Sequence, residues 1–234
     1  MACSECGLDP MCQVLDYAEP GSGVPAGILL RRQPVTKGAQ LFQIEQPFTA
    51  VYAVKSGSFK ATVPDLNRTE HVVGFYLPGD LIGAEGMANR SYSYSVRALE
   101  ASSVCVLETH RLRESGRSIE AVQHALIEML GQEVALNHRV TASLIRQNAD
   151  QRLAAFILSL SLRASMRGLG SKRLNLGMSR SDMASYLGLA RETISRVLTR
   201  FQKTGLIRLR QQRLTLLDEA GLRQVATYTK SAWH

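Results

Sequence analysis

Four cysteines are the residues of this 234-residue chain best suited to inorganic chemistry. Three are crowded at one end, as Cys3-x2-Cys6-x5-Cys12, and the fourth is Cys105. Four thiolates hold a cubane iron–sulfur cluster, and they need not be close in sequence. An all-thiolate zinc site is an alternative, although zinc sites more often use two short C-x-x-C-type pairs. A thiol or disulfide redox switch is a third possibility.

Residues 179–201 have the pattern of a helix-turn-helix, a motif that binds DNA. Ser179 is a candidate helix cap with Asp182 three residues later. Gly188 suits a turn that needs positive φ, and Ile194 suits the core contact of the second helix. That helix should enter the DNA major groove, where Arg pairs with guanine and Glu accepts from cytosine. The expected base-reading residues are Arg191, Glu192, Ser195 and Arg196.

Charge is spread unevenly along the chain. Residues 1–145 carry 12 Lys and Arg against 15 Asp and Glu, whereas residues 146–234 carry 16 against 5. A basic half joined to a near-neutral half is typical of a nucleic-acid-binding module linked to a regulatory one. We therefore expect double-stranded DNA as a partner. The expected phosphate contacts, which position the protein without specifying sequence, are Ser179, Arg180, Thr193, Arg200 and Lys203, with Arg208, Arg210 and Arg213 in a two-stranded wing over 206–217.

The elements that must position these residues fall into an α+β arrangement. After an irregular segment over 1–23, short β runs separated by Gly and Pro turns extend over 24–114, which predicts an antiparallel β-roll or sandwich of the jelly-roll type. A helix follows over 148–166 and leads into the helix-turn-helix and wing, within a domain spanning 147–234. The predicted strands are 41–44, 50–54, 59–63, 72–76 and 104–107.

Residues 115–146 form the link between the two domains. Apolar residues recur there near a 3.5-residue spacing, which predicts a helix of about 28 residues and about 42 Å. A domain of this size cannot bury so long a helix along its whole length, so we expect it to pair with a second copy in a homodimer. Polar Asn137 lies on the seam, where it would set register or oligomeric state. The expected dimer contacts are Leu126, Leu130, Asn137, Val140 and Leu144.

A β-roll, a long helix and a winged helix-turn-helix, in that order, resemble the Crp/Fnr superfamily of transcription regulators. The match is closest to its Fnr-type, oxygen-sensing members, on the cysteine spacing, on Ala53–Gly57, on Asn148–Phe156 and on the E-x-x-S-R run from Glu192 to Arg196. The resemblance implies that Cys3, Cys6, Cys12 and Cys105 ligate an oxygen-labile [4Fe–4S] cluster that controls dimerisation. It also implies TTGAT-type palindromic sites and contact with RNA polymerase through a loop around 80–89.

Other functions are less well supported by the residues. The cyclic-nucleotide branch of the family pairs a Glu after a glycine with a later Arg, but Ala84 follows Gly83 here and Tyr92 stands near the expected Arg. Arg90 and Glu85 leave a shifted alignment open. The five His residues have no ligand or triad spacing and no phosphate-binding glycine loop occurs, so we expect no enzyme activity. No apolar run of about 18 residues and no export signal is present, which predicts a cytoplasmic protein without a membrane span.

Overall fold

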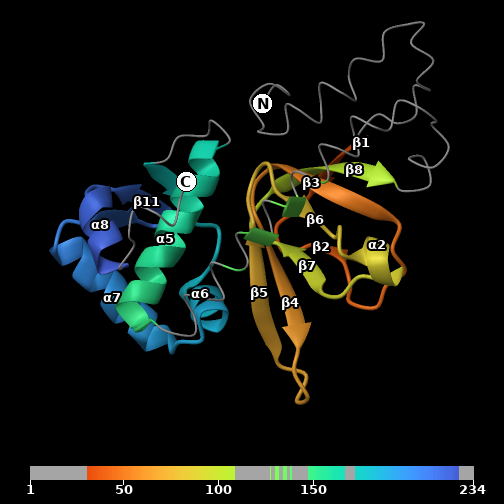
Figure 1. The fold of residues 1–234 in the computed structure, drawn as a ribbon. Helices are drawn as coiled ribbons and strands as arrows, with labels where there is room; N and C mark the ends of the chain where they lie inside the picture. Colours follow the sequence, from red (N-terminus) through yellow and green to blue (C-terminus); the bar gives the residue numbers. More distant parts are fainter. Residues whose placement is uncertain are drawn as a thin grey trace, which may run out of the picture. The chain divides into compact units, whose positions relative to one another are not determined.

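The computed structural model describes residues 31–108, 127, 130, 131, 134, 135, 138, 147–166 and 172–226. The chain divides into two compact units, Met1–Val134 and Ala135–His234, and each is described by itself (Figure 1). Several predicted residues lie outside the described part of the chain: Cys3, Cys6, Cys12, Leu126, Asn137, Val140 and Leu144.

The first unit is an antiparallel β-roll made of two four-stranded sheets. Their strand orders are β1-β8-β3-β6 and β2-β7-β4-β5, and all the pairings are antiparallel. This confirms the predicted architecture (Figure 1). The elements are β1 (Arg31–Val35), β2 (Gln40–Phe42), β3 (Ala50–Ser56), β4 (Phe59–Pro64), β5 (Glu70–Tyr76), β6 (Leu81–Ile82), α2 (Gly86–Asn89), β7 (Ser95–Ala98) and β8 (Ser102–Glu108).

The core of the β-roll is built by both sheets. Val54 and Val104 come from one sheet and Phe59 and Val96 from the other, and all four belong to one buried cluster. Side chains on a strand alternate between its two faces, so every second residue of these strands contributes to this cluster. The five predicted strands correspond to β2, β3, β4, β5 and β8. Strands β1, β6 and β7 and the short α2 were not predicted.

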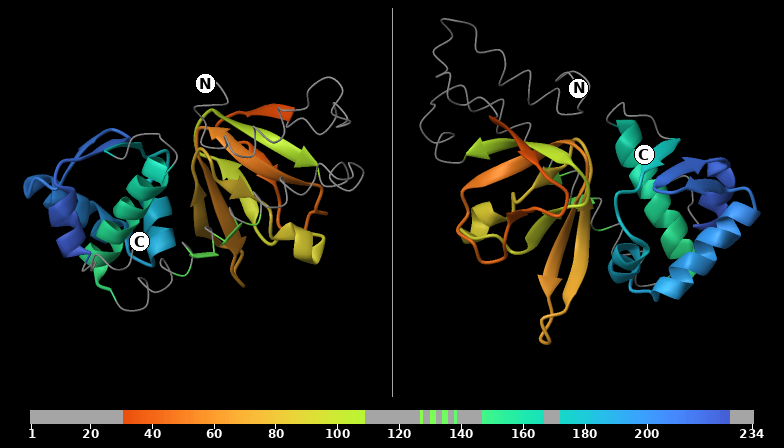
Figure 2. Two further views of the ribbon diagram at one scale, coloured as in Figure 1. Left: turned by 45° about the horizontal axis from the view of Figure 1, so that its top comes forward. Right: turned by 180° about the vertical axis from the view of Figure 1, so that it is seen from behind.

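The described residues 147–226 of the second unit combine helices α5 to α8 with a small sheet. Strands β10, β11 and β9 form it in that order, so the predicted two-stranded wing has a third strand. Helix α5 packs against α7, α8 and β9, and two further views show it running through the unit (Figure 2). The elements are α5 (Ala149–Met166), β9 (Arg173–Asn175), α6 (Arg180–Leu187), α7 (Arg191–Lys203), β10 (Ile207–Arg210), β11 (Arg213–Leu216) and α8 (Glu219–Val225).

The described positions of the predicted long helix, from 127 to 138, are all helical. Ile127 and Val134, seven residues apart, are 69% and 54% exposed. Residues at this spacing lie on one side of a helix. The helix therefore carries an apolar stripe that the described chain leaves in solvent. No helix of the described residues is long and apolar enough to cross a membrane.

Candidate nucleic-acid interface

The first helix of the helix-turn-helix, α6, is closed at both ends by local contacts. The Asp182 amide donates to Ser179 Oγ at 3.0 Å, and the Ser179 amide donates to Asp182 Oδ2 at 2.9 Å. This reciprocal capping box satisfies amides that have no partner inside the helix. At the other end Gly188 has φ 62°, a left-handed conformation that glycine adopts without strain. The predicted cap and turn are therefore confirmed, and the Ser179 hydroxyl is used as a cap.

Helix α7 buries one side and exposes the other. Ile194, Val197, Leu198 and Phe201 are buried against the rest of the unit. The opposite side is formed by residues at i, i+4, i+7 and i+11, which follow one line along a helix with 3.6 residues per turn. We call this line the reading stripe; its members, all exposed, are Glu192, Arg196, Thr199 and Lys203.

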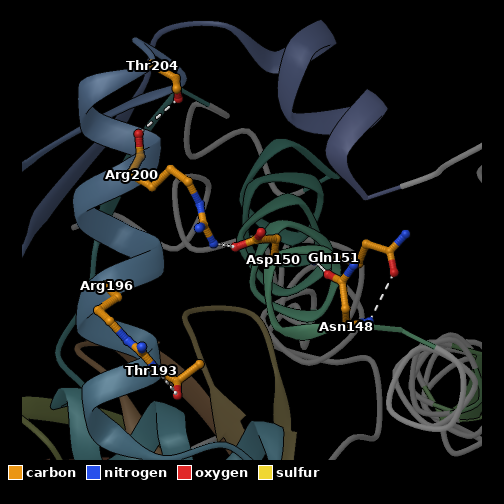
Figure 3. A network of polar contacts seen from close by, with 7 residues as sticks. All are labelled: Asn148, Asp150, Gln151, Thr193, Arg196, Arg200 and Thr204. Atoms are coloured by element: carbon orange, nitrogen blue, oxygen red, sulfur yellow. Dashed lines mark hydrogen bonds and ion pairs between the residues drawn. The ribbon is translucent and has the colours of Figure 1, made fainter.

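The reading stripe contains two predicted base-reading residues that make no ion pair with each other in the described part of the chain. Arg196 instead donates from Nη2 to Thr193 Oγ1 at 3.2 Å (Figure 3). Glu192 and Arg196 thus both present charged groups to solvent, and a purely helix-stabilising i,i+4 pair is not formed. Thr199, which lies between Arg196 and Lys203 on the stripe, was not predicted. Its helical spacing from Glu192 was the available signal.

The other predicted contacts lie beside the reading stripe. Ser195 accepts a hydrogen bond from Arg180 Nη1 at 3.2 Å, which joins the two helices of the motif. Arg191 is exposed at the start of α7. Arg200 forms an ion pair with Asp150 in the first turn of α5 (Figure 3). The structure thus brings together most of the predicted set, with Arg200 already held by an acidic side chain.

The small sheet adds four arginines on one exposed face. Arg208 of β10 lies opposite Thr215 of β11, which lies opposite Arg173 of β9. Directly opposite residues share a face. Arg210 and Arg213 form the next row of the same face. Arg173 was not predicted, although its alternation with buried Leu174 and Leu176 was a signal for a strand.

Cys105 is the one candidate metal ligand within the described residues. It lies in β8 between Arg32 of β1 and Ala53 of β3, and Ala53 in turn lies opposite Leu81 of β6. Cys105, Ala53 and Leu81 are all buried. The preceding residue, Val104, points to the other side of the sheet, where it belongs to the core cluster. The described residues contain no group of three or more His, Cys, Asp or Glu side chains that could hold a metal ion.

Comparison with known proteins matches each of the two units to a known protein family. Residues 32–116 match the cyclic nucleotide-binding domain, and residues 151–225 match the Crp-like helix-turn-helix domain. The transcriptional activator protein anr of Pseudomonas aeruginosa is 36% identical over 94% of this chain and 90% of its own length. The chain belongs to the Crp/Fnr family of transcription regulators.

Other members of the Crp/Fnr family show the same full-length similarity. The fumarate and nitrate reduction regulatory protein of Escherichia coli is 31% identical over 98% of this chain and 92% of its own length. The solved structure of FixK2 from Bradyrhizobium japonicum, 24% identical, has a TM-score of 0.75 and covers 85% of this chain and 98% of that one. This Crp/Fnr-family chain is a DNA-binding regulator and not an enzyme.

In this Crp/Fnr-family β-roll, the position near the expected nucleotide-binding arginine is a core aromatic residue. The Tyr92 ring is buried and stacks on Phe42 with centroids 3.7 Å apart. Its hydroxyl donates to the Ala50 carbonyl at 2.8 Å. A side chain of this kind supplies no positive charge, and a buried phosphate requires one.

In the shifted alignment, Glu85 would take the place of the ribose-binding glutamate, but its carboxylate already has a partner in the protein. Tyr94 donates to Glu85 Oε2 at 2.8 Å and accepts from the Gly83 amide at 3.2 Å. Burial, with the neighbouring Tyr76 and Glu85, raises the pKa of Tyr94 far above its usual value. The carboxylate that would bind a ribose is therefore engaged with a neutral tyrosine of the protein itself.

Proposed function

We propose that this chain is an oxygen-responsive regulator that binds TTGAT-type palindromic DNA as a homodimer under the control of a [4Fe–4S] cluster. The observation that carries the DNA part is the reading stripe. It is the solvent-facing side of α7. The other side of this helix is buried, and α7 also contacts the capped helix α6. Its position in a region with 16 basic against 5 acidic residues adds sequence-independent attraction to DNA.

The base-reading roles follow from the chemistry of each group on α7. Arg196 suits a bidentate contact to guanine O6 and N7, and Glu192 suits acceptance from cytosine N4. Ser195 and Arg191 lie next to them at the start of the helix. Lys203, at the far end of the reading stripe, suits a phosphate, as do the sheet arginines Arg173, Arg208, Arg210 and Arg213.

The cluster is assigned to Cys3, Cys6, Cys12 and Cys105. Cys105 supports this assignment because it is buried, with apolar Ala53 and Leu81 on one side of it in the same row of the sheet and Arg32 of β1 on the other. Such surroundings exclude water, which is one of the factors that set the properties of a cluster. When bound, the cluster would supply the sensitivity to oxygen. Relatives named for the reduction of fumarate and nitrate suit a regulator of anaerobic metabolism.

Dimerisation is assigned to the long helix, through Leu126, Leu130, Asn137, Val140 and Leu144. The exposed apolar pair Ile127 and Val134 supports an additional partner surface there. A dimer presents two reading stripes, and a palindrome presents two equivalent half-sites about 34–36 Å apart. RNA polymerase is the further partner proposed for a cytoplasmic regulator of this kind.

A DNA selection tests the function most simply. Anaerobically purified protein should enrich palindromes with TTGAT-type half-sites from random duplexes, because two identical stripes read the two halves. The same selection after exposure to air should lose this enrichment. Enrichment of an unrelated sequence, or equal enrichment in air, would contradict the proposal.

A further inference from the structure

The ion pair between Asp150 and Arg200 connects the start of α5 to α7, the helix that carries the reading stripe (Figure 3). Arg200 lies four residues after Arg196, which rotates it by about 40° from that residue around the helix. The Arg200 side chain is long and still 56% exposed, so we expect it to reach a DNA phosphate when the reading stripe faces the groove. Arg200 is therefore placed where two anions compete for it, the Asp150 carboxylate and a DNA phosphate.

The backbone that carries Asp150 is held in the first turn of α5. The Asn148 amide donates to Gln151 Oε1 and the Gln151 amide donates to Asn148 Oδ1, both at 3.0 Å, so the first turn of α5 is closed by side chains (Figure 3). Arg152, in the same turn, donates from Nη1 to the Leu187 carbonyl at 3.1 Å, which ties α5 to the end of α6. A move of Arg200 to a phosphate therefore breaks the ion pair.

Asp150 is also unusual among the five acidic residues of 146–234. Asp182 and Asp218 cap helices, Glu219 pairs with Arg223 on α8, and Glu192 lies on the reading stripe. In the described residues, Asp150 is the acidic side chain that pairs with a basic side chain of α7. An exposed pair of this kind contributes little to folding stability, so its effect on binding can be measured separately.

We propose that Asp150 restrains DNA binding, because it holds Arg200 away from the phosphate backbone and lowers affinity for duplexes of any sequence. The proposal rests on the DNA-binding function proposed above. A phosphate contact carries no sequence information, so the restraint acts equally on target and non-target DNA. It limits the fraction of the protein held on non-target DNA.

The test is the salt dependence of binding by anaerobically purified full-length protein to a non-target duplex. Asp150→Asn should tighten binding several-fold and steepen the slope of log K against log salt by about 0.9, the value for one added phosphate contact. Arg200→Gln should leave the wild-type slope nearly unchanged, and in the Asp150→Asn background it should cancel the gain. Glu219→Gln is the matched control: it makes the same charge change at an ion pair on α8 and should leave the slope unchanged.

Four outcomes would overturn the restraint, the last of them together with the DNA-binding proposal. Asp150→Asn without tighter binding, in a variant with the wild-type melting temperature, shows that Arg200 is not withheld. Arg200→Gln that lowers the wild-type slope by about 0.9 shows that Arg200 binds phosphate despite Asp150. An equal gain from Glu219→Gln shows a general effect of net charge. If the wild-type protein binds duplexes with no salt dependence, the DNA-binding proposal fails together with the restraint.

Discussion

Arg196 and Lys203 lie on the same reading stripe of α7, yet they should contribute to DNA binding differently. Arg196→Ala should weaken binding to a TTGAT-type site by about 1–3 kcal/mol and relax the preference at one base pair, because a bidentate contact to guanine is lost. Competition binding against sites changed one base pair at a time measures this. An Arg196→Ala protein that keeps both its affinity and its sequence preference would show that another side of α7 faces the groove.

Lys203→Ala is the matched comparison at the other end of the stripe. Loss of a phosphate contact should weaken binding to all sequences about equally and reduce the salt slope by about 0.9. The preference among sites should not change, since phosphates are the same in every sequence. A salt titration on target and non-target duplexes measures both quantities. A selective loss on the target alone would instead assign Lys203 to base reading.

At the scale of the element, the capping box of α6 separates a structural role from a DNA role for Ser179. Ser179→Ala should lower the free energy of unfolding by about 1 kcal/mol, because the Asp182 amide loses its acceptor. Ser181→Ala, an exposed position in the same turn that takes no part in the cap, is the control. Urea denaturation measures the difference. Equal stability of the two variants would mean that the cap contributes nothing, leaving a phosphate contact as the role of Ser179.

The sequence predicts these elements best where a pattern is long or chemically distinctive. The spacing of Ser179, Asp182 and Gly188 predicted α6 and its turn, and the short β runs at 50–54 and 59–63, each followed by a Gly or Pro turn, predicted β3 and β4. Strand β6 has only two residues, which is too short for a periodic signal, and the three residues of β9 give only one short alternation. Strand β1 was missed because it begins with charged Arg31 and Arg32 and so lacks the apolar residues typical of a strand.

The candidate site was predictable to a similar extent. The composition of α7 was enough to nominate Glu192 and Arg196, because helical spacing is local. The pairing of Arg200 with Asp150 was not predictable, since the two are 50 residues apart and meet only when α5 packs on α7. The place of Arg173 on the small sheet was not predictable for the same reason, because its partner strand β11 lies about 40 residues further along the chain. Contacts that depend on tertiary packing require the structure.

At the scale of the whole molecule, dimerisation through the long helix should be required for specific DNA binding. Replacing Leu130 and Val140 together with Glu should give folded monomers, because like charges would face each other across the seam. These monomers should lose binding to the palindrome while retaining weak, salt-sensitive binding, since a single reading stripe engages one half-site. Analytical ultracentrifugation and circular dichroism measure assembly and folding.

A control for this prediction uses Ala135→Glu, which places a glutamate at an exposed helical position that is not among the predicted dimer contacts. This variant should remain a dimer under anaerobic conditions. If the Leu130 and Val140 double variant also sediments as an unchanged dimer, the seam lies elsewhere on the chain.

Metal analysis of anaerobically purified protein, combined with DNA binding before and after exposure to air, tests most directly whether a [4Fe–4S] cluster controls this regulator. We expect a brown protein with about four irons and matching sulfide per chain, which binds a TTGAT palindrome until air removes both the colour and the binding. Cys→Ser at any of Cys3, Cys6, Cys12 or Cys105 should give colourless protein, whereas Ala53→Ser, which adds the same hydroxyl to the buried face beside Cys105, should keep the cluster. A stable, colourless wild-type protein with one zinc per chain and the same DNA affinity in air would rule out control by an iron–sulfur cluster.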